Sequence, residues 1–209
     1  MDCFNIHTHT ILHPGKEIVS YDVSAFSPGE GYVSVGIHPW TLTEENANSQ
    51  WEVLQELVLD KRIMAIGEAG LDKLKGSSLE LQTNLFLKAI LLSEAKGLPL
   101  VIHCVKAFNE LIQLRKEIRP QQPWIVHGFR GKFPLAEDLL KHGCFLSFGD
   151  KFQVEAVRNT PIDRLFVETD DSDIPIEDIY QNIANVRGMT SGELIEAVNK
   201  NVQKVFLKA

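Results

Sequence analysis

IMAIGE, residues Ile63–Glu68, is the stretch that decides the fold. Four apolar residues follow one another and then give way to a glycine and to the carboxylate of Glu68. A continuous apolar run is typical of a strand buried on both faces, which is how strands lie in parallel sheets. An acid directly after such a strand has its side chain at the carboxyl end of the sheet, where barrel enzymes carry their active sites. We therefore expect a buried parallel strand that ends in a functional carboxylate.

Short apolar runs of this kind recur along the chain, and amphipathic helical stretches separate most of them. Gly97 and Gly143 stand where a helix should end before the next strand. This alternation predicts an α/β fold, a (β/α)8 TIM-type barrel. The predicted strands are Cys3–Ile6, Ile18–Val23, Tyr32–Ile37, Ile63–Ile66, Leu98–Ile102, Trp124–Val126, Cys144–Phe148 and Arg164–Val167.

The barrel should be trimmed. The segment between the second and third predicted strands is too short for a full helix, and the chain has 209 residues, below the roughly 250 typical of this fold. No linker or repeat divides the sequence. We expect one barrel domain over residues 1–209 that lacks the helix between strands 2 and 3.

Charge and cysteine content narrow the functional classes. The net charge of −7 argues against a protein that coats nucleic acid non-specifically. Three cysteines without a CxxC pair are typical of reduced thiols. The first residues lack the features of a signal peptide, and no apolar run is long enough for a membrane span. The expectation is a cytoplasmic protein with no membrane association and no obligate protein partner.

Histidines and acids follow the predicted strands at one common position. His7 and His9 are two residues apart at the end of the first strand, so that their side chains should share a face. Other imidazoles and carboxylates directly follow later strands, and parallel strand ends converge on one rim. A shared cation would compensate for burying these groups. The candidate metal ligands are His7, His9, Glu68, His103, His127 and Asp170.

The ligand types limit the metal. Imidazoles and carboxylates without a thiolate suit Zn²⁺, Mn²⁺, Fe²⁺ or Mg²⁺. Six candidates exceed what one tetrahedral ion needs, so two divalent ions bridged by a carboxylate fit better. His38 precedes Pro39, which should hold this imidazole at the rim, where it could contact a substrate oxyanion.

Seven segments of the chain, in order, resemble the TatD family of metal-dependent deoxyribonucleases, which are amidohydrolase-like TIM barrels. The resemblance spans nearly the whole sequence. The segments are HTHT (His7–Thr10), GIHPW (Gly36–Trp40), AIGEAGLD (Ala65–Asp72), LPLVIHC (Leu98–Cys104), HGFRG (His127–Gly131), ETDD (Glu168–Asp171) and NVQKVF (Asn201–Phe206).

The resemblance implies a role for each matched position. Glu68 would bridge two metal ions. The pair at the first strand and the acid after the last strand would hold one ion, and two later histidines would hold the other. In that order, the implied ligands are His7, His9 and Asp170, and then His103 and His127.

The reaction implied by the resemblance is hydrolysis of phosphodiester bonds in DNA, in the manner of a 3'-5' exonuclease. A metal-activated water would attack phosphorus. Glu68 and Asp170 would be the catalytic acids, with Asp170 orienting or deprotonating the water. Glu168 would support the site from behind, and Arg130 would meet a substrate phosphate.

Three departures from the family pattern bear on this interpretation. Asn5 stands where the family has an aspartate, the usual aspartate after the second histidine is missing, and the loop after Asp171 is short. Two alternatives therefore stay open. One is a PHP-type phosphoesterase acting on a small phosphate monoester, because that class also opens with HxHT. The other is a degenerate metal-binding barrel that serves as a non-catalytic interaction module.

Overall fold

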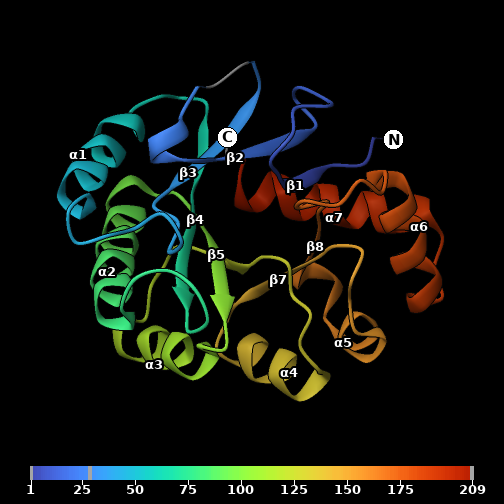
Figure 1. Cartoon of the computed structure of the whole chain (residues 1–209). Coiled ribbons are helices and arrows are strands. Elements are labelled where there is room, and N and C mark those ends of the chain that lie inside the picture. The colour runs from blue at the N-terminus through green and yellow to red at the C-terminus, as the bar shows by residue number, and fades with distance from the viewer. Residues whose placement is uncertain (1, 28–29, 208–209) are drawn as a thin grey trace.

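Eight parallel strands form one sheet in the computed structural model, which describes residues 2–27 and 30–207. The strands pair in chain order from β1 to β8, so the sheet curls into a nearly closed barrel (Figure 1). The predicted fold class is confirmed. The strands are β1 (Asn5–Thr8), β2 (Glu17–Asp22), β3 (Tyr32–Gly36), β4 (Ile63–Asp72), β5 (Leu100–Val105), β6 (Trp124–Val126), β7 (Phe145–Phe148) and β8 (Leu165–Val167).

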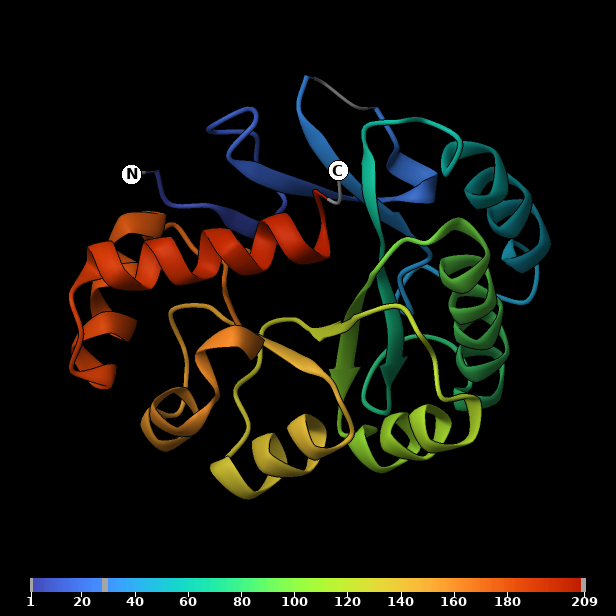
Figure 2. The same ribbon diagram turned by 180° about the vertical axis from the view of Figure 1, so that it is seen from behind.

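Helices surround the barrel, but their ring is interrupted over β1, β2 and β3 (Figures 1 and 2). None of the described helices is both long and apolar enough to cross a membrane. The helices are α1 (Ala47–Leu57), α2 (Leu79–Lys96), α3 (Phe108–Ile118), α4 (Phe133–Lys141), α5 (Val154–Asn159), α6 (Ile176–Arg187) and α7 (Ser191–Val205).

The interruption agrees with the predicted loss of a helix between strands 2 and 3. The described residues of that connection hold only a single 3-10 turn, η1 (Val23–Ala25). The connection from β1 to β2, residues 9–16, is also a loop without a helix, which the sequence did not indicate. Aromatic pairs pack beside these strands: Tyr21 meets Phe26 edge-on, and Phe4 stacks on Tyr32.

The barrel closes at a seam between β8 and β1. The amide of Asp170 donates a hydrogen bond of 3.0 Å to the carbonyl of His7, in a parallel bridge that joins Thr8 to Asp170. Asn5 crosses the same seam, because its amide nitrogen donates to the hydroxyl of Thr169 at 2.8 Å and its oxygen accepts from the Thr169 amide at 3.1 Å. A carboxylate at this position could not donate the first of these bonds. The seam therefore brings the first and last strands together through residues next to the predicted ligands.

The predicted strand bounds agree with the structure to within three residues, except at β4. The prediction ended this strand at Ile66, whereas it continues to Asp72. Its two interior glycines, Gly67 and Gly70, permit close contact with the neighbouring strand. Gly70 pairs in register with His103 of β5, at a φ of +152°. A Cβ atom on Gly70 would lie 2.0 Å from the carbonyl oxygen of His103.

Replacement of Gly70 by alanine should lower the free energy of unfolding by about 3 kcal/mol or more, because it combines a backbone conformation reserved for glycine with a clash against a neighbouring strand. Urea unfolding followed by far-UV circular dichroism measures the change. Gly97→Ala is the matched control: Gly97 also has a positive φ, +69°, but open space lies around its Cβ position, so about 1–2 kcal/mol should be lost there. Equal losses in the two variants would contradict the close-contact argument.

Candidate metal centre

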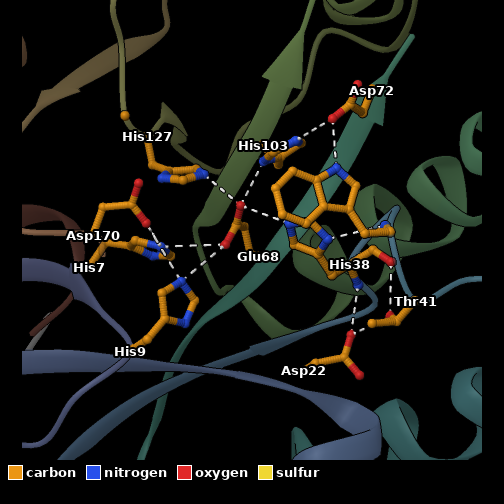
Figure 3. Close-up of polar contacts among 12 residues, drawn as sticks. His7, His9, Asp22, His38, Thr41, Glu68, Asp72, His103, His127 and Asp170 are labelled. Atoms are coloured by element: carbon orange, nitrogen blue, oxygen red, sulfur yellow. Dashed lines mark hydrogen bonds and ion pairs between the residues drawn. The ribbon is translucent and has the colours of Figure 1, made fainter. Parts of the chain in front are cut away.

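The carboxylate of Glu68 lies at the centre of the predicted cluster (Figure 3). It is buried near the carboxyl end of β4. Three imidazoles approach its Oε1 atom: Nδ1 of His103 at 2.7 Å, Nε2 of His127 at 2.7 Å and Nε2 of His38 at 3.0 Å. These side chains come from the ends of β3, β5 and β6, so one carboxylate oxygen joins residues that are far apart in sequence.

The second oxygen of Glu68 faces a separate pair of imidazoles. Nε2 of His7 lies 3.4 Å and Nε2 of His9 lies 3.7 Å from Glu68 Oε2. Oδ1 of Asp170 is 3.6 Å from each of the same two nitrogens. The two oxygens of Glu68 thus face two different groups of nitrogen atoms, as the close-up in Figure 3 shows.

The electrostatics of the cluster follow from this crowding. Burial alone would raise the pKa of Glu68, but the charge of His127 and the hydrogen bonds from the surrounding imidazoles hold that pKa well below its usual range. Burial would lower the pKa of His7, yet the nearby carboxylates of Asp170 and Glu68, at ion-pair distance, raise it to about 9. The pKa of His127 is likewise raised, because Glu68 and Glu168 outweigh burial. The buried acids therefore require positive charge beside them.

A divalent cation would supply that charge, and the donor atoms fit one. His7 is fully buried, and neither of its ring nitrogens has a hydrogen-bond partner among the described residues. A buried nitrogen without a partner is costly, whereas a metal ion would satisfy it. Groups of three donors close enough to share an ion are His7, His9 and Glu68; His7, His127 and Asp170; His38, Glu68 and His103; and the more exposed His9, Asp170 and Asp171.

Glu168 lies behind His127, where the resemblance places a supporting residue. It is fully buried at the end of β8, and its Oε1 atom accepts the amide hydrogen of Gly128 at 2.6 Å. The same oxygen is 3.4 Å from Nδ1 of His127. A carboxylate behind a ligating imidazole fixes the orientation of the ring and increases its basicity.

His38 differs from the other imidazoles because a backbone amide determines which of its ring nitrogens carries the proton. The Trp40 amide donates to Nδ1 of His38 at 3.1 Å. In the neutral ring the proton then sits on Nε2, so this atom donates toward Glu68. Asp22 holds the same turn by accepting from the His38 amide and, at 2.7 Å, from the Thr41 hydroxyl. His38 therefore presents a hydrogen-bond donor to the centre rather than a free lone pair.

Two acids of the site escaped the sequence prediction. Asp72 is buried at the end of β4, and its Oδ2 atom lies 3.1 Å from Nε2 of His103. Because side chains two and four residues apart on a strand share a face, the spacing from Glu68 to Asp72 was a signal for it. Asp22 ends β2, so it stands at the strand position that identified the other candidates.

The cluster opens into a pocket of about 1110 Å³. Arg130, the predicted phosphate contact, lies on its rim with Nη2 3.8 Å from Oδ2 of Asp170. Lys106 and the aromatic side chains of Tyr21 and Trp40 also line it. All the residues predicted for metal and substrate binding are thus gathered at one mouth of the barrel.

Comparison with known proteins identifies the family of the chain. The family model for TatD-related DNases matches residues 16–207, a range that begins after His7 and His9. The metal-dependent hydrolase YabD of Bacillus subtilis is 28% identical over 200 residues, covering 84% of this chain and 77% of its own. The 3'-5' ssDNA/RNA exonuclease TatD of Erwinia tasmaniensis is 27% identical over 206 residues, which cover 86% of this chain and 79% of the relative.

Solved structures support the same fold. The crystal structure of YJJV, a TatD homologue from Escherichia coli K12, is 21% identical and matches with a TM-score of 0.85 over 99% of this chain and 98% of that one. The resemblance noted in the sequence is therefore confirmed. The chain belongs to the TatD-related DNase family and is a metal-dependent hydrolase.

Proposed function

We propose that this protein hydrolyses phosphodiester bonds in nucleic acid, removing nucleotides from a 3' end with the help of two divalent ions. The observation that carries the proposal is that the two carboxylate oxygens of Glu68 face separate groups of imidazoles. A carboxylate shared in this way is what a two-ion phosphoesterase needs between its metals.

The proposed ligands divide around Glu68. His7, His9 and Asp170 would hold one ion together with Glu68 Oε2, and His103 and His127 would hold the other together with Oε1. When bound, the ions would lower the pKa of water and neutralise charge on the phosphate oxygens.

Three side chains of the pocket have proposed roles toward the substrate. Asp170, whose pKa is held low by His7 and His9 against the opposing effect of burial, would stay ionised and orient or deprotonate the attacking water. His38 would donate the hydrogen bond of its Nε2–H to a phosphate oxygen in place of Glu68, because the Trp40 amide already occupies Nδ1. Arg130 would add positive charge at the rim, where its side chain is more than half exposed.

The size of the pocket and one relative favour a polymer substrate. The pocket volume of about 1110 Å³ lies at the upper end of the roughly 300–1,000 Å³ usual for small-molecule sites, which leaves room for more than a small phosphate monoester. The Erwinia relative carries a 3'-5' exonuclease function in its name. Both observations support nuclease activity over the PHP-type alternative, and the set of ligand types at the centre opposes a purely structural metal site.

The purified protein should shorten single-stranded DNA from its 3' end and lose this activity in a chelator. A 5'-labelled oligonucleotide resolved on a denaturing gel shows the ladder, and elemental analysis of the same sample gives the metal and its stoichiometry. Small phosphate monoesters are assayed in parallel. Turnover of monoesters without cleavage of DNA would favour the PHP-type reaction, and no turnover with metal fully bound would favour a non-catalytic barrel.

Glu68→Ala should lower both the metal content and the activity, because the bridging carboxylate contributes to both proposed ion sites. The expected loss of kcat/KM is more than about 100-fold, beyond what supporting residues of metal sites cost. His142→Ala is the control, because His142 follows α4, contacts Asp138 and lies outside the pocket lining. Unchanged metal stoichiometry in Glu68→Ala would contradict the bridging role.

His38→Ala should lower kcat by about 100-fold, the scale of removing one transition-state hydrogen-bond donor, while the metal content stays as in the wild type. Elemental analysis and steady-state kinetics on one preparation give both values. Loss of an ion in this variant would show that His38 is a ligand rather than a donor.

A further inference from the structure

Trp40 is a large aromatic residue of the pocket to which the proposed reaction assigns no role. It follows His38 and Pro39 beyond the end of β3, and its side chain lines the pocket. The residue is 46% exposed, although the other two tryptophans, Trp51 and Trp124, are half-buried and fully buried. An exposed indole inside a pocket is a surface that a ligand can cover.

The indole is held in place by the β4–α2 connection. Its Nε1 atom donates to Oδ2 of the buried Asp72 at 2.7 Å. The ammonium group of Lys75 lies 3.5 Å from the indole centroid. Gly76 passes so close to the turn that a Cβ there would lie 2.1 Å from the Pro39 carbonyl oxygen. The ring is therefore fixed before any ligand arrives, so that binding against it loses little conformational entropy.

The fixed indole lies next to the metal centre. Its centroid is 4.9 Å from the ring of His38 and 5.4 Å from the ring of His103. Asp72 connects the indole to the metal centre. Its Oδ2 atom, which accepts from Trp40, also lies 3.1 Å from Nε2 of His103 (Asp72 and His103 in Figure 3). A phosphodiester held at His38 would have a nucleoside on either side of it, within reach of the Trp40 indole.

We propose that Trp40 stacks against a nucleobase next to the scissile phosphate. This inference rests on the proposed nuclease function. Every base has a π-face, so stacking on a tryptophan binds single strands without selecting their sequence. The ammonium group of Lys75 lies over one face of the indole and outside the pocket lining, so the base would stack on the other face, with the positive charge of Lys75 near the adjoining backbone. Trp40 would thus form a base-binding wall of the pocket.

A simpler role for Trp40 would be to cover Asp72 and support His103 through the Nε1 hydrogen bond. The two roles differ in what they require of the side chain. Stacking requires an aromatic face and does not depend on the N–H group. Support of His103 through Asp72 requires the N–H group, which phenylalanine lacks. Trp40→Phe and Trp40→Ala therefore separate the two roles.

The test measures binding, so that it does not depend on turnover. Fluorescence anisotropy gives Kd for two labelled single strands with hydrolysis-resistant phosphorothioate linkages, one of thymidines and one of abasic tetrahydrofuran residues. The wild-type protein, as purified with its own metal, should bind the thymidine strand more tightly. Trp40→Ala should weaken that binding by about 5- to 150-fold, which corresponds to about 1–3 kcal/mol of stacking, and leave the abasic strand unchanged. Trp40→Phe should keep most of the preference for bases.

Trp51→Ala is the matched control. Trp51 lies on α1 with Lys88 over its ring at 5.6 Å, so it is also a lysine–tryptophan pair, but it lies outside the pocket lining. This variant should bind both strands as the wild type does. Equal weakening of both strands by Trp40→Ala, or a Phe variant that behaves like the Ala variant, would overturn the stacking role.

Failure of the proposed function gives a different result. If the protein binds thymidine strands through Trp40 yet cleaves no phosphodiester, the base-binding role of Trp40 stands and the nuclease proposal is wrong. If the protein shortens DNA but binds abasic and thymidine strands equally, the nuclease proposal stands and the stacking role of Trp40 is wrong.

Discussion

One buried carboxylate, that of Glu68, organises the functional end of this barrel. Five imidazoles lie around it, three at one oxygen and two at the other. Removing an acid from water is costly unless positive charge compensates for it. The cluster meets this condition either with protonated imidazoles or with bound cations, and the partnerless nitrogens of His7 favour cations. The geometry of the centre is thus a consequence of burying one carboxylate.

The backbone around Glu68 makes this burial possible. Glycines on either side of it let β4 and β5 approach so closely that a Cβ at Gly67 would lie 2.3 Å from the Val101 carbonyl oxygen. At the other side of the mouth, the β8–β1 seam places Asp170 against His7. Asn5, which departs from the family pattern, makes two hydrogen bonds across that seam. Asn5 therefore has a structural role, because it joins the first and last strands of the barrel.

Supporting residues join the metal centre to the pocket wall. Asp72 contacts both His103 and the indole of Trp40, while the Trp40 amide sets the protonation of His38. The turn Gly36–Trp40 therefore contributes to two surfaces: His38 faces the metal centre, and the Trp40 indole faces the pocket. A substitution in this turn should be interpreted with both measurements, metal content and substrate affinity, because each reports on a different surface.

The sequence by itself determined the strand order, the missing helix after the second strand and the set of histidines and acids, because buried strands and their functional ends leave a local pattern of apolar runs followed by polar residues. Even Asp72, which was overlooked, lies on the same strand face as Glu68. Only the tertiary structure decided how Glu68 divides its oxygens, that β4 extends through Gly67 and Gly70, and that Trp40 is fixed at the pocket wall. Those features depend on contacts between strands and loops that are distant in sequence, such as Gly70 with His103 and Gly76 with Pro39, and no local pattern specifies such contacts.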